Sequence, residues 1–236
     1  MTLKVAVIGA HGRVGQLVCD KLRDNEAFTP LAVVRSQEQA DFFESKGIVA
    51  SLKDIESSSV AQIADLVRDC DAVVWVAGAG GKGVERIFTV DLDGAIKTVE
   101  ACEQACVRRF VMLSAINAES RENWYGTALR NYYIAKRTAD YVVRHSHLDY
   151  TIWQPGSLIN ASGTGRVCAL DEIGEKRSVH YEITREDVAE VIVQGLLYPQ
   201  TCLKQTVPLA NGALPIETFL RSLKERDAGA AIAGGD

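Results

Sequence analysis

The sequence has no long hydrophobic run and no excess of positive charge. No window approaches the roughly eighteen consecutive apolar residues that a membrane-spanning helix needs. The 26 Lys and Arg residues face 31 Asp and Glu residues, and the resulting net charge of −5 argues against a nucleic-acid or anionic-membrane partner. The N-terminus begins with a strand pattern and not with a basic region followed by a signal-type apolar segment. We therefore expect a cytoplasmic protein.

The spacing that marks a metal site is also absent. The chain has six cysteines and four histidines, and the cysteines are scattered through helix-like and strand-like segments. This distribution predicts reduced thiols and not a compact disulfide framework. Cys102 and Cys106 share one helical face, but no histidine pair at ligand spacing accompanies them. We predict that the protein binds no metal.

The most informative feature present is a glycine-rich motif at the N-terminus. An apolar strand runs directly into Gly9-Ala10-His11-Gly12-Arg13-Val14-Gly15. Gly9 would make the tight turn, Gly12 would let backbone N–H groups approach phosphates, and Gly15 would let the next helix pack closely. Because the motif follows a strand and opens a helix, it predicts a dinucleotide site. The alternative is an ordinary glycine-rich turn.

The end of the second predicted strand indicates which dinucleotide binds. An NAD-binding protein commonly has an acidic residue there, for the ribose 2′-hydroxyl, and this chain has Arg35. Arg13, inside the glycine loop, adds a second guanidinium. Guanidinium groups suit a 2′-phosphate, so the sequence favours NADP(H). The alternative is that both arginines are ordinary solvated surface residues.

A second glycine cluster, Gly78–Gly83, follows the fourth predicted strand. It is not a P-loop, because Val76 stands where the first glycine is required and Gly83 stands where Ser or Thr would bind magnesium. Small residues at a strand end would let the backbone approach the cofactor, so we interpret the cluster as a cofactor wall. A plain flexible loop is the alternative.

Strand and helix patterns alternate along most of the chain, which predicts an α/β fold with a doubly wound parallel sheet. The predicted strands are Leu3–Ile8, Leu31–Val34, Ile48–Ala50, Ala72–Ala77, Arg109–Ser114 and Tyr150–Gln154. The predicted helices are Val14–Leu22, Glu38–Ser45, Val60–Arg68, Val90–Cys106 and Asn131–His145.

The pattern loosens after Pro155, and we expect a small C-terminal substrate cap over residues 156–226. Its predicted elements are a strand near Ser178–His180, a helix opened by Thr184, the strand Thr206–Leu209 and the helix Ile216–Lys224. Residues 1–226 would then form one Rossmann domain, and residues 227–236 a flexible tail.

Three residues form a candidate catalytic group. Ser114 ends the fifth predicted strand, and Tyr132 and Lys136 lie four apart in the next helix, on one face. An ammonium beside a phenol is expected to lower its pKa, which makes tyrosine a usable general acid or base. Ser114 would hydrogen-bond the same substrate oxygen. A helix surface pair without function is the alternative.

These motifs, with Thr89–Gly94 and Tyr150–Leu158, resemble the atypical short-chain dehydrogenase/reductases, and most closely a small fungal group with an epimerase-like or NmrA-like fold. The resemblance implies that Lys136 binds the nicotinamide ribose, that Ser114 and Tyr132 face the substrate carbonyl, and that Pro155 and Gly156 back the nicotinamide ring. The predicted cofactor-binding residues are Gly9, His11, Gly12, Arg13, Val14, Gly15, Arg35, Ser36, Asp54, Ala77, Gly78, Ala79, Ser114, Lys136, Pro155, Gly156, Ser157 and Leu158. Members of this family commonly pair through the helices after the fourth and fifth strands, so a homodimer is one expectation.

Two points within this resemblance stay open. Tyr133 adjoins Tyr132 and has Arg137 four residues on, so the choice of Tyr132 depends on Lys136. Trp124 and Tyr125 lie in the linker before this helix, either as part of a substrate wall or lid or as aromatic anchors for the loop.

The sequence favours an NADP(H)-dependent oxidoreductase that acts on a small apolar carbonyl or quinone, because the segment after Gln154 is short. Many atypical members lack the tyrosine and some sense NADP(H) without chemistry, so a redox sensor that signals to a protein partner is the alternative. A nucleotide-sugar epimerase shares the Tyr–Lys arrangement, but the chain lacks the length for a sugar-nucleotide domain.

Overall fold

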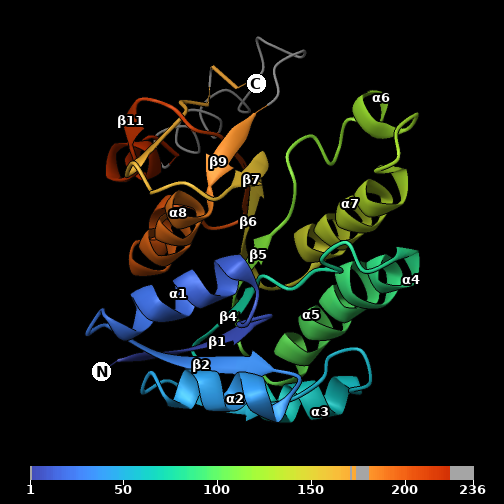
Figure 1. Cartoon of the computed structure of the whole chain (residues 1–236), viewed down its shortest axis with the longest axis vertical. Helices are drawn as coiled ribbons and strands as arrows, with labels where there is room; N and C mark the ends of the chain where they lie inside the picture. The colour runs from blue at the N-terminus through green and yellow to red at the C-terminus, as the bar shows by residue number, and fades with distance from the viewer. Residues whose placement is uncertain (1, 171, 174–180, 224–236) are drawn as a thin grey trace, which may run out of the picture.

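The computed structural model describes residues 2–170, 172–173 and 181–223, and its centre is a seven-stranded parallel sheet (Figure 1). The strands are β1 (Leu3–Ile8), β2 (Phe28–Val34), β3 (Val49–Leu52), β4 (Ala72–Trp75), β5 (Arg109–Leu113), β6 (Asp149–Pro155) and β10 (Gln205–Leu209). Their spatial order is β10-β6-β5-β4-β1-β2-β3. The predicted doubly wound Rossmann fold is therefore confirmed.

Helices cover both faces of this sheet. They are α1 (Arg13–Arg23), α2 (Gln37–Glu44), α3 (Val60–Val67), α4 (Val84–Arg86), α5 (Ala95–Gln104), α6 (Arg121–Trp124), α7 (Arg130–His145) and α8 (Arg185–Leu197), with the π-helix η1 (Ile87–Gly94) and the 3₁₀ turn η2 (Pro199–Thr201). Val5 and Val7 of β1 pack into the core beneath α1 and α8, while Ala6 and Ile8 pack into the core beneath α3, α5 and α7. Figure 1 shows α1 and α8 on one side of the sheet and α5 and α7 on the other. Burial on both sides explains why the last four residues of β1, Val5–Ile8, are continuously apolar.

The strand order reverses at β1, which pairs with β2 on one side and with β4 on the other. In an open parallel sheet this reversal leaves a crevice at the carboxyl ends of the strands, because the two connecting chains leave in opposite directions. The glycine loop follows β1 and the second glycine cluster follows β4, so both predicted cofactor segments border the crevice.

The C-terminal part contains small paired strands as well as α8. Two pairs form, β7 (Ser157–Ile159) with β9 (Glu182–Thr184) and β8 (Arg166–Val167) with β11 (Leu214–Pro215). Residues 216–223 are helical. The predicted strand Ser178–His180 and the predicted tail 227–236 lie outside the described residues.

One predicted helix differs in form. The helix expected over Val90–Cys106 is α5 preceded by the π-helix η1, which begins at Ile87. A π-helix carries wider turns than an α-helix, and single wide turns occur often at functional sites. Within the described ranges, no helix has both the length and the apolar character required to cross a membrane.

Candidate cofactor and active site

The glycine loop brings the ends of β1 and β4 into direct contact. Gly9 has a φ of 85°, a left-handed conformation, and a Cβ there would lie 2.5 Å from the Ala77 Cα. A Cβ at Gly15 would lie 2.4 Å from the Gly9 carbonyl oxygen, which explains the close start of α1. In the part of the chain that the structure describes, no side chain caps α1, so its first N–H groups suit a phosphate.

A cavity of about 600 Å³ lies along the carboxyl ends of β1, β2 and β4. Half of the predicted cofactor residues line it, and they come from the four segments that follow β1, β2, β3 and β4. These are Gly9, His11, Gly12, Arg13, Arg35, Asp54, Ala77, Gly78 and Ala79. The cavity is also lined by Lys82, which belongs to the predicted cofactor wall, and by Gln39, Lys53, Glu56 and Arg86, which the sequence did not indicate.

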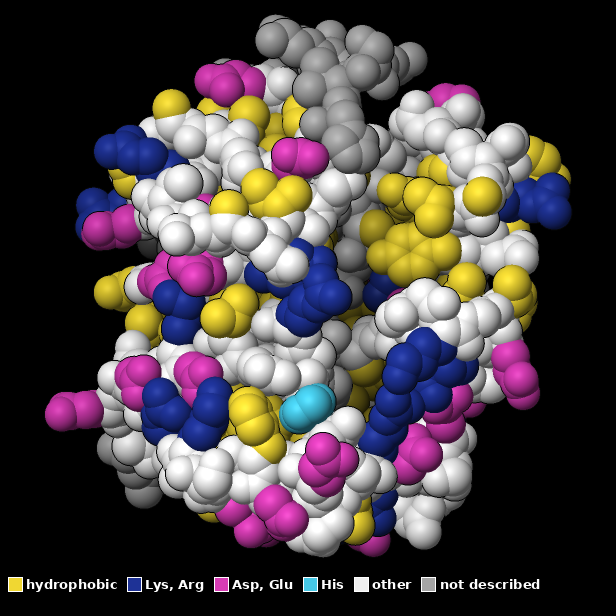
Figure 2. All heavy atoms as spheres, viewed as in Figure 1, with side chains coloured by type: hydrophobic (Ala, Val, Ile, Leu, Met, Phe, Trp, Pro, Cys, Tyr) yellow, Lys and Arg dark blue, Asp and Glu magenta, His cyan; other side chains and the backbone are white. Residues whose placement is uncertain are grey.

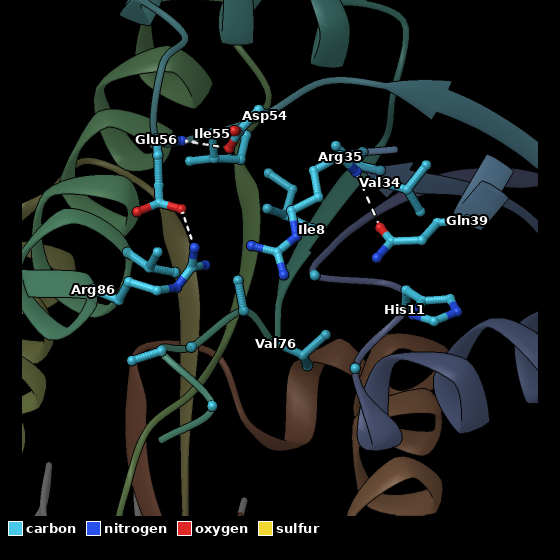
Figure 3. Close-up of a pocket in the computed structure, with 18 of the residues that line it drawn as sticks. Ile8, His11, Val34, Arg35, Gln39, Asp54, Ile55, Glu56, Val76 and Arg86 are labelled. Carbon is cyan, nitrogen blue, oxygen red and sulfur yellow. Dashed lines mark hydrogen bonds and ion pairs between the residues drawn. The ribbon is translucent and has the colours of Figure 1, made fainter. Parts of the chain in front are cut away.

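Positive charge predominates in this cavity. Arg86 is ion-paired with Glu56 at 2.5 Å, and the guanidinium of Arg35 extends into the pocket between Arg86 and Gln39 (Figure 3). The backbone N–H of Arg35 donates to the Gln39 side chain at 3.2 Å, which fixes the start of α2 beside it. Among the described residues, no carboxylate forms an ion pair with the guanidinium groups of Arg35 or Arg13. Figure 2 shows Lys and Arg side chains gathered around the central hollow of this face.

Asp91 of η1 links the second glycine cluster to the predicted catalytic lysine. Its Oδ2 accepts the backbone N–H of Ala79 at 2.8 Å, and its Oδ1 lies 3.0 Å from the Lys136 Nζ. Lys136 is 3% exposed and also donates to the Leu113 carbonyl oxygen at 3.3 Å. Burial opposes its charge, but Asp91 and the neighbouring Tyr132 raise the pKa of Lys136 above its ordinary value. The ammonium is therefore held charged and fixed in position.

Tyr132 lies beside Lys136, whose Nζ is 5.8 Å from the centroid of the ring. Tyr133 instead stacks on Trp124, with ring centroids 5.6 Å apart. The expectation that Lys136 gives the phenol a lowered pKa is wrong. Burial is the largest effect and raises the pKa of Tyr132, and the ammonium offsets only part of that rise. The phenol is therefore protonated at neutral pH.

Ser114 is 4% exposed, and its hydroxyl is engaged within the protein. Its Oγ donates to Asp140 Oδ2 at 2.8 Å, and its backbone N–H donates to the Trp153 carbonyl oxygen. The same Asp140 oxygen accepts a hydrogen bond from the Gln154 side chain at 2.9 Å. No sequence pattern indicated a role for Asp140, which α7 places one turn after Lys136.

The other predicted residues lie near these groups but do not line the cavity. Val14 and Gly15 are buried in the first turn of α1, and Ser36 precedes α2. Pro155 ends β6, Gly156 follows it, and both are buried; the next strand, β7, carries Ser157 and Leu158. In the described ranges, no group of three or more His, Cys, Asp or Glu residues is placed to hold a metal ion.

The linker before α7 uses its aromatic residues in two ways. Trp124 is 2% exposed, and its Nε1 donates to the Asn117 carbonyl oxygen, so this ring anchors the loop. Tyr125 is 59% exposed and Leu129 is 55% exposed. In Figure 2, hydrophobic side chains gather over the α6–α7 region at the edge of the central hollow. The linker thus has a buried anchor and, on its outer surface, two exposed apolar side chains among polar ones.

Comparison with known proteins places this site in a family. A family model described as NAD(P)H-binding matches residues 9–199. The chain is 56% identical over 224 residues to the UPF0659 protein YMR090W of Saccharomyces cerevisiae, covering 94% of this chain and 99% of that protein. It is 39% identical to a Bacillus subtilis protein named as an uncharacterized sugar epimerase, YhfK, covering 94% of this chain and 100% of that one.

A solved structure supports the same assignment. The oxidoreductase ylbE from Lactococcus lactis superposes with a TM-score of 0.84 at 32% identity, covering 94% of this chain and 97% of that one. The resemblance to the atypical short-chain dehydrogenase/reductases is therefore confirmed. The glycine loop at the strand-order reversal and the similarity along nearly the whole chain lead to one conclusion: this chain belongs to the NAD(P)H-binding family, among its Rossmann-fold oxidoreductase-like and epimerase-like members.

Proposed function

We propose that the protein is an NADP(H)-dependent oxidoreductase that reduces a small, apolar carbonyl or quinone compound. The observation that carries this proposal is the combination of a cation-lined cavity at the strand-order reversal with a tyrosine beside a buried, ion-paired lysine. The first feature suits a dinucleotide phosphate, and the second supplies a proton donor.

The charges of the cavity support NADP(H) over NAD(H). Arg35 stands at the end of β2, where a carboxylate would repel a 2′-phosphate, and its guanidinium extends into the cavity. Lys53, Lys82 and Arg13 line the same cavity. Arg86 is neutralised by Glu56, so it shapes the wall of the cavity more than it adds to the positive charge there. Planar guanidinium groups bind phosphate oxygens in pairs, which gives affinity and orientation together.

The residues of the chain define the rest of the chemistry. NADPH, when bound, would supply the hydride for the substrate carbonyl carbon. Tyr132 donates its phenolic proton to the substrate oxygen, which becomes the hydroxyl of the product, and Lys136 stabilises the phenolate that remains. Solvent then returns a proton to Tyr132. Because burial raises the pKa of Tyr132, the phenol is present as an acid, so we expect reduction to be favoured over oxidation at neutral pH.

The surface beside Tyr132 supports a small apolar substrate. Tyr125 and Leu129 expose apolar area next to the Tyr133–Trp124 stack. Among the described residues after β6, the elements outside the central sheet are two short strand pairs, α8, η2 and the helical residues 216–223, a small set of elements to enclose a large substrate. A sugar nucleotide would need more enclosing structure than these elements provide.

The test begins with fluorescence titration by NADPH and NADH, followed by the loss of nicotinamide absorbance against a panel of quinones and aldehydes. We expect tighter NADPH binding and turnover. The variant Tyr132→Phe should keep its NADPH affinity and lose about 10² to 10⁴-fold in kcat, because it removes a proton donor but no cofactor contact. Tyr133→Phe is the matched control and should retain turnover, since its ring stacks on Trp124. Full activity in Tyr132→Phe would exclude the proposed acid.

A redox sensor without turnover is the second candidate. It is favoured by one observation: Lys136 and Ser114 already have protein partners, Asp91 and Asp140, so these groups are satisfied without a substrate. The same titration separates the two candidates. Tight NADPH binding with no turnover of any panel compound would support the sensor.

A further inference from the structure

A buried carboxyl group lies directly behind the predicted catalytic residues. Tyr132, Lys136 and Asp140 are four apart on α7 and therefore share one face of that helix. Asp140 is 0% exposed, and its Oδ2 accepts hydrogen bonds from Ser114 Oγ at 2.8 Å and from Gln154 Nε2 at 2.9 Å. Its Oδ1 is buried and has no hydrogen-bond partner among the described residues.

A chain of polar contacts connects this carboxyl group to the surface. Gln154 Nε2 also donates to Glu119 Oε2 at 3.0 Å, and Glu119 Oε1 is ion-paired with Arg144 at 2.6 Å. These contacts join the end of β5, the loop after it, β6 and α7. Ser114 supplies the hydroxyl proton in this set of contacts, so the charge of Asp140 decides where that proton points.

The direction of the hydrogen bond between Ser114 and Asp140 depends on the protonation state of the carboxyl group. A serine hydroxyl has one proton to donate, and an ionised carboxylate can only accept. While Asp140 is ionised, Ser114 donates to it and offers only lone pairs to a substrate oxygen. When Asp140 carries a proton, the carboxyl donates to Ser114 Oγ, and the Ser114 proton becomes available to a substrate carbonyl.

The surroundings of Asp140 make both states accessible. Burial raises its pKa to about 6, and the negative charge of Glu119 acts in the same direction. The Ser114 and Gln154 hydrogen bonds and the ammonium of Lys136 oppose this rise. Tyr132 also lies close enough to interact electrostatically with Asp140. Lys136 is itself ion-paired with Asp91, which leaves it a weak partner for Asp140.

We propose that Asp140 is a positioning residue that orients the Ser114 hydroxyl, so that its protonated form lets Ser114 donate a hydrogen bond to the substrate carbonyl oxygen and its ionised form withdraws that donor. The inference rests on the proposed carbonyl reduction. It assigns Ser114 the second hydrogen bond on the oxygen that receives the Tyr132 proton, and it makes that bond dependent on pH.

The test is the pH profile of kcat for carbonyl reduction by the full chain. In the wild type, kcat should fall as the pH rises through about 6, by up to about tenfold per pH unit. Asp140→Asn keeps the side-chain shape but cannot titrate, so this step should disappear. Ser114→Ala should lose the step as well, with kcat lower by about 10² to 10³-fold at low pH, because one donor to the oxygen is gone.

Two further variants identify the titrating group. Glu119→Gln removes a negative charge that raises the pKa of Asp140, so the midpoint of the step should move to lower pH. Asp65→Asn changes an exposed carboxylate on α3, paired only with Arg68, and should leave the profile unchanged. A step that persists in Asp140→Asn or in Ser114→Ala would overturn the inference while leaving the proposed function intact. No turnover by the wild type at any pH would instead refute the proposed function.

Unfolding provides a readout that needs no substrate. A buried carboxyl with a raised pKa stabilises the folded state fully below its unfolded-state pKa, and this stabilisation is lost as the pH rises through the folded-state value. The free energy of unfolding of the wild type, relative to Asp140→Asn, should therefore fall between about pH 4 and about pH 6. A titration seen in unfolding without any step in kcat would show that Asp140 does not act through Ser114.

Discussion

At the scale of the residue, single side chains determine which groups of a ligand the cavity can bind. Arg35 follows the last residue of β2, and in the described part of the chain no ion pair neutralises its guanidinium. A cation without a counterion in a cavity is favourable only with water or with an anion from a ligand, because a protein charge prefers a partner. Arg86 shows the contrast, since it forms an ion pair with Glu56. Arg35, like Arg13, is thus available to an anionic group of a ligand.

Substitution of Arg35 tests this availability. Arg35→Gln removes a charge-assisted hydrogen bond, worth about 1.5 to 3 kcal/mol, so the Kd for NADPH should rise by about ten- to hundredfold. The Kd for NADH should change little, because NADH lacks the 2′-phosphate. Arg68→Gln, at an exposed arginine that pairs with Asp65, is the matched control. Equal weakening of NADPH and NADH binding would place Arg35 on another part of the dinucleotide.

At the scale of elements, the turn from β1 into α1 depends on glycine at two points. Gly9 needs its left-handed φ, and Gly15 needs the absence of a Cβ where α1 passes the Gly9 and Ala10 carbonyls. The first contact positions the loop against β4, and the second sets how deeply the helix N-terminus approaches the crevice. Both steric requirements are imposed by backbone atoms, which cannot move aside as a flexible side chain can.

A methyl group at Gly15 should therefore be costly. In Gly15→Ala the new Cβ would lie 2.4 Å from one backbone oxygen and 2.6 Å from another, so the helix must shift. We expect a loss of about 1 to 3 kcal/mol in the free energy of unfolding, measured by denaturant titration, together with weaker NADPH binding. Gly126→Ala meets no atom within 4 Å and should be close to neutral. Unchanged cofactor affinity in Gly15→Ala would show that the position of α1 does not determine how the phosphates bind.

The sequence predicted elements better than the contacts between them. Hydrophobic runs and the glycine motif located every strand of the central sheet, and the four-residue spacing of Tyr132 and Lys136 placed both on one helix face, as the structure has them. The pairing of Asp140 with Ser114 joins α7 to β5 across 26 residues, and no local period encodes it. Asp91 lies in the motif Thr89–Gly94, but its two contacts start from the π-helix η1, which hydrophobic periodicity does not reveal.

At the scale of the whole molecule, the charge of the cofactor cavity is opposite in sign to the net charge of the protein. The chain carries a formal charge of −5, whereas five Lys and Arg side chains and only two carboxylates line the cavity: Arg13, Arg35, Lys53, Lys82 and Arg86 against Asp54 and Glu56. Acidic residues elsewhere on the surface repel an anionic ligand, and the cavity attracts it. A field of this kind concentrates an anion at one position on the protein.

This arrangement predicts how salt affects the two dinucleotides. The Debye length falls from about 10 Å at 0.1 M salt to about 3 Å at 1 M, so charge on the open side of a cavity is screened strongly in that range. NADPH has one phosphate more than NADH and should lose affinity more steeply, with the ratio of the two Kd values shrinking by about three- to tenfold. Fluorescence titration at several NaCl concentrations measures both slopes. In the Arg35→Gln variant, the dependence of the NADPH Kd on salt concentration should come close to that of the NADH Kd. The reason is that the variant already lacks the contact between Arg35 and the 2′-phosphate, which salt screens in the wild type. Parallel slopes in the wild type would mean that neutral hydrogen bonds, and not the cations of the cavity, carry any preference for NADPH.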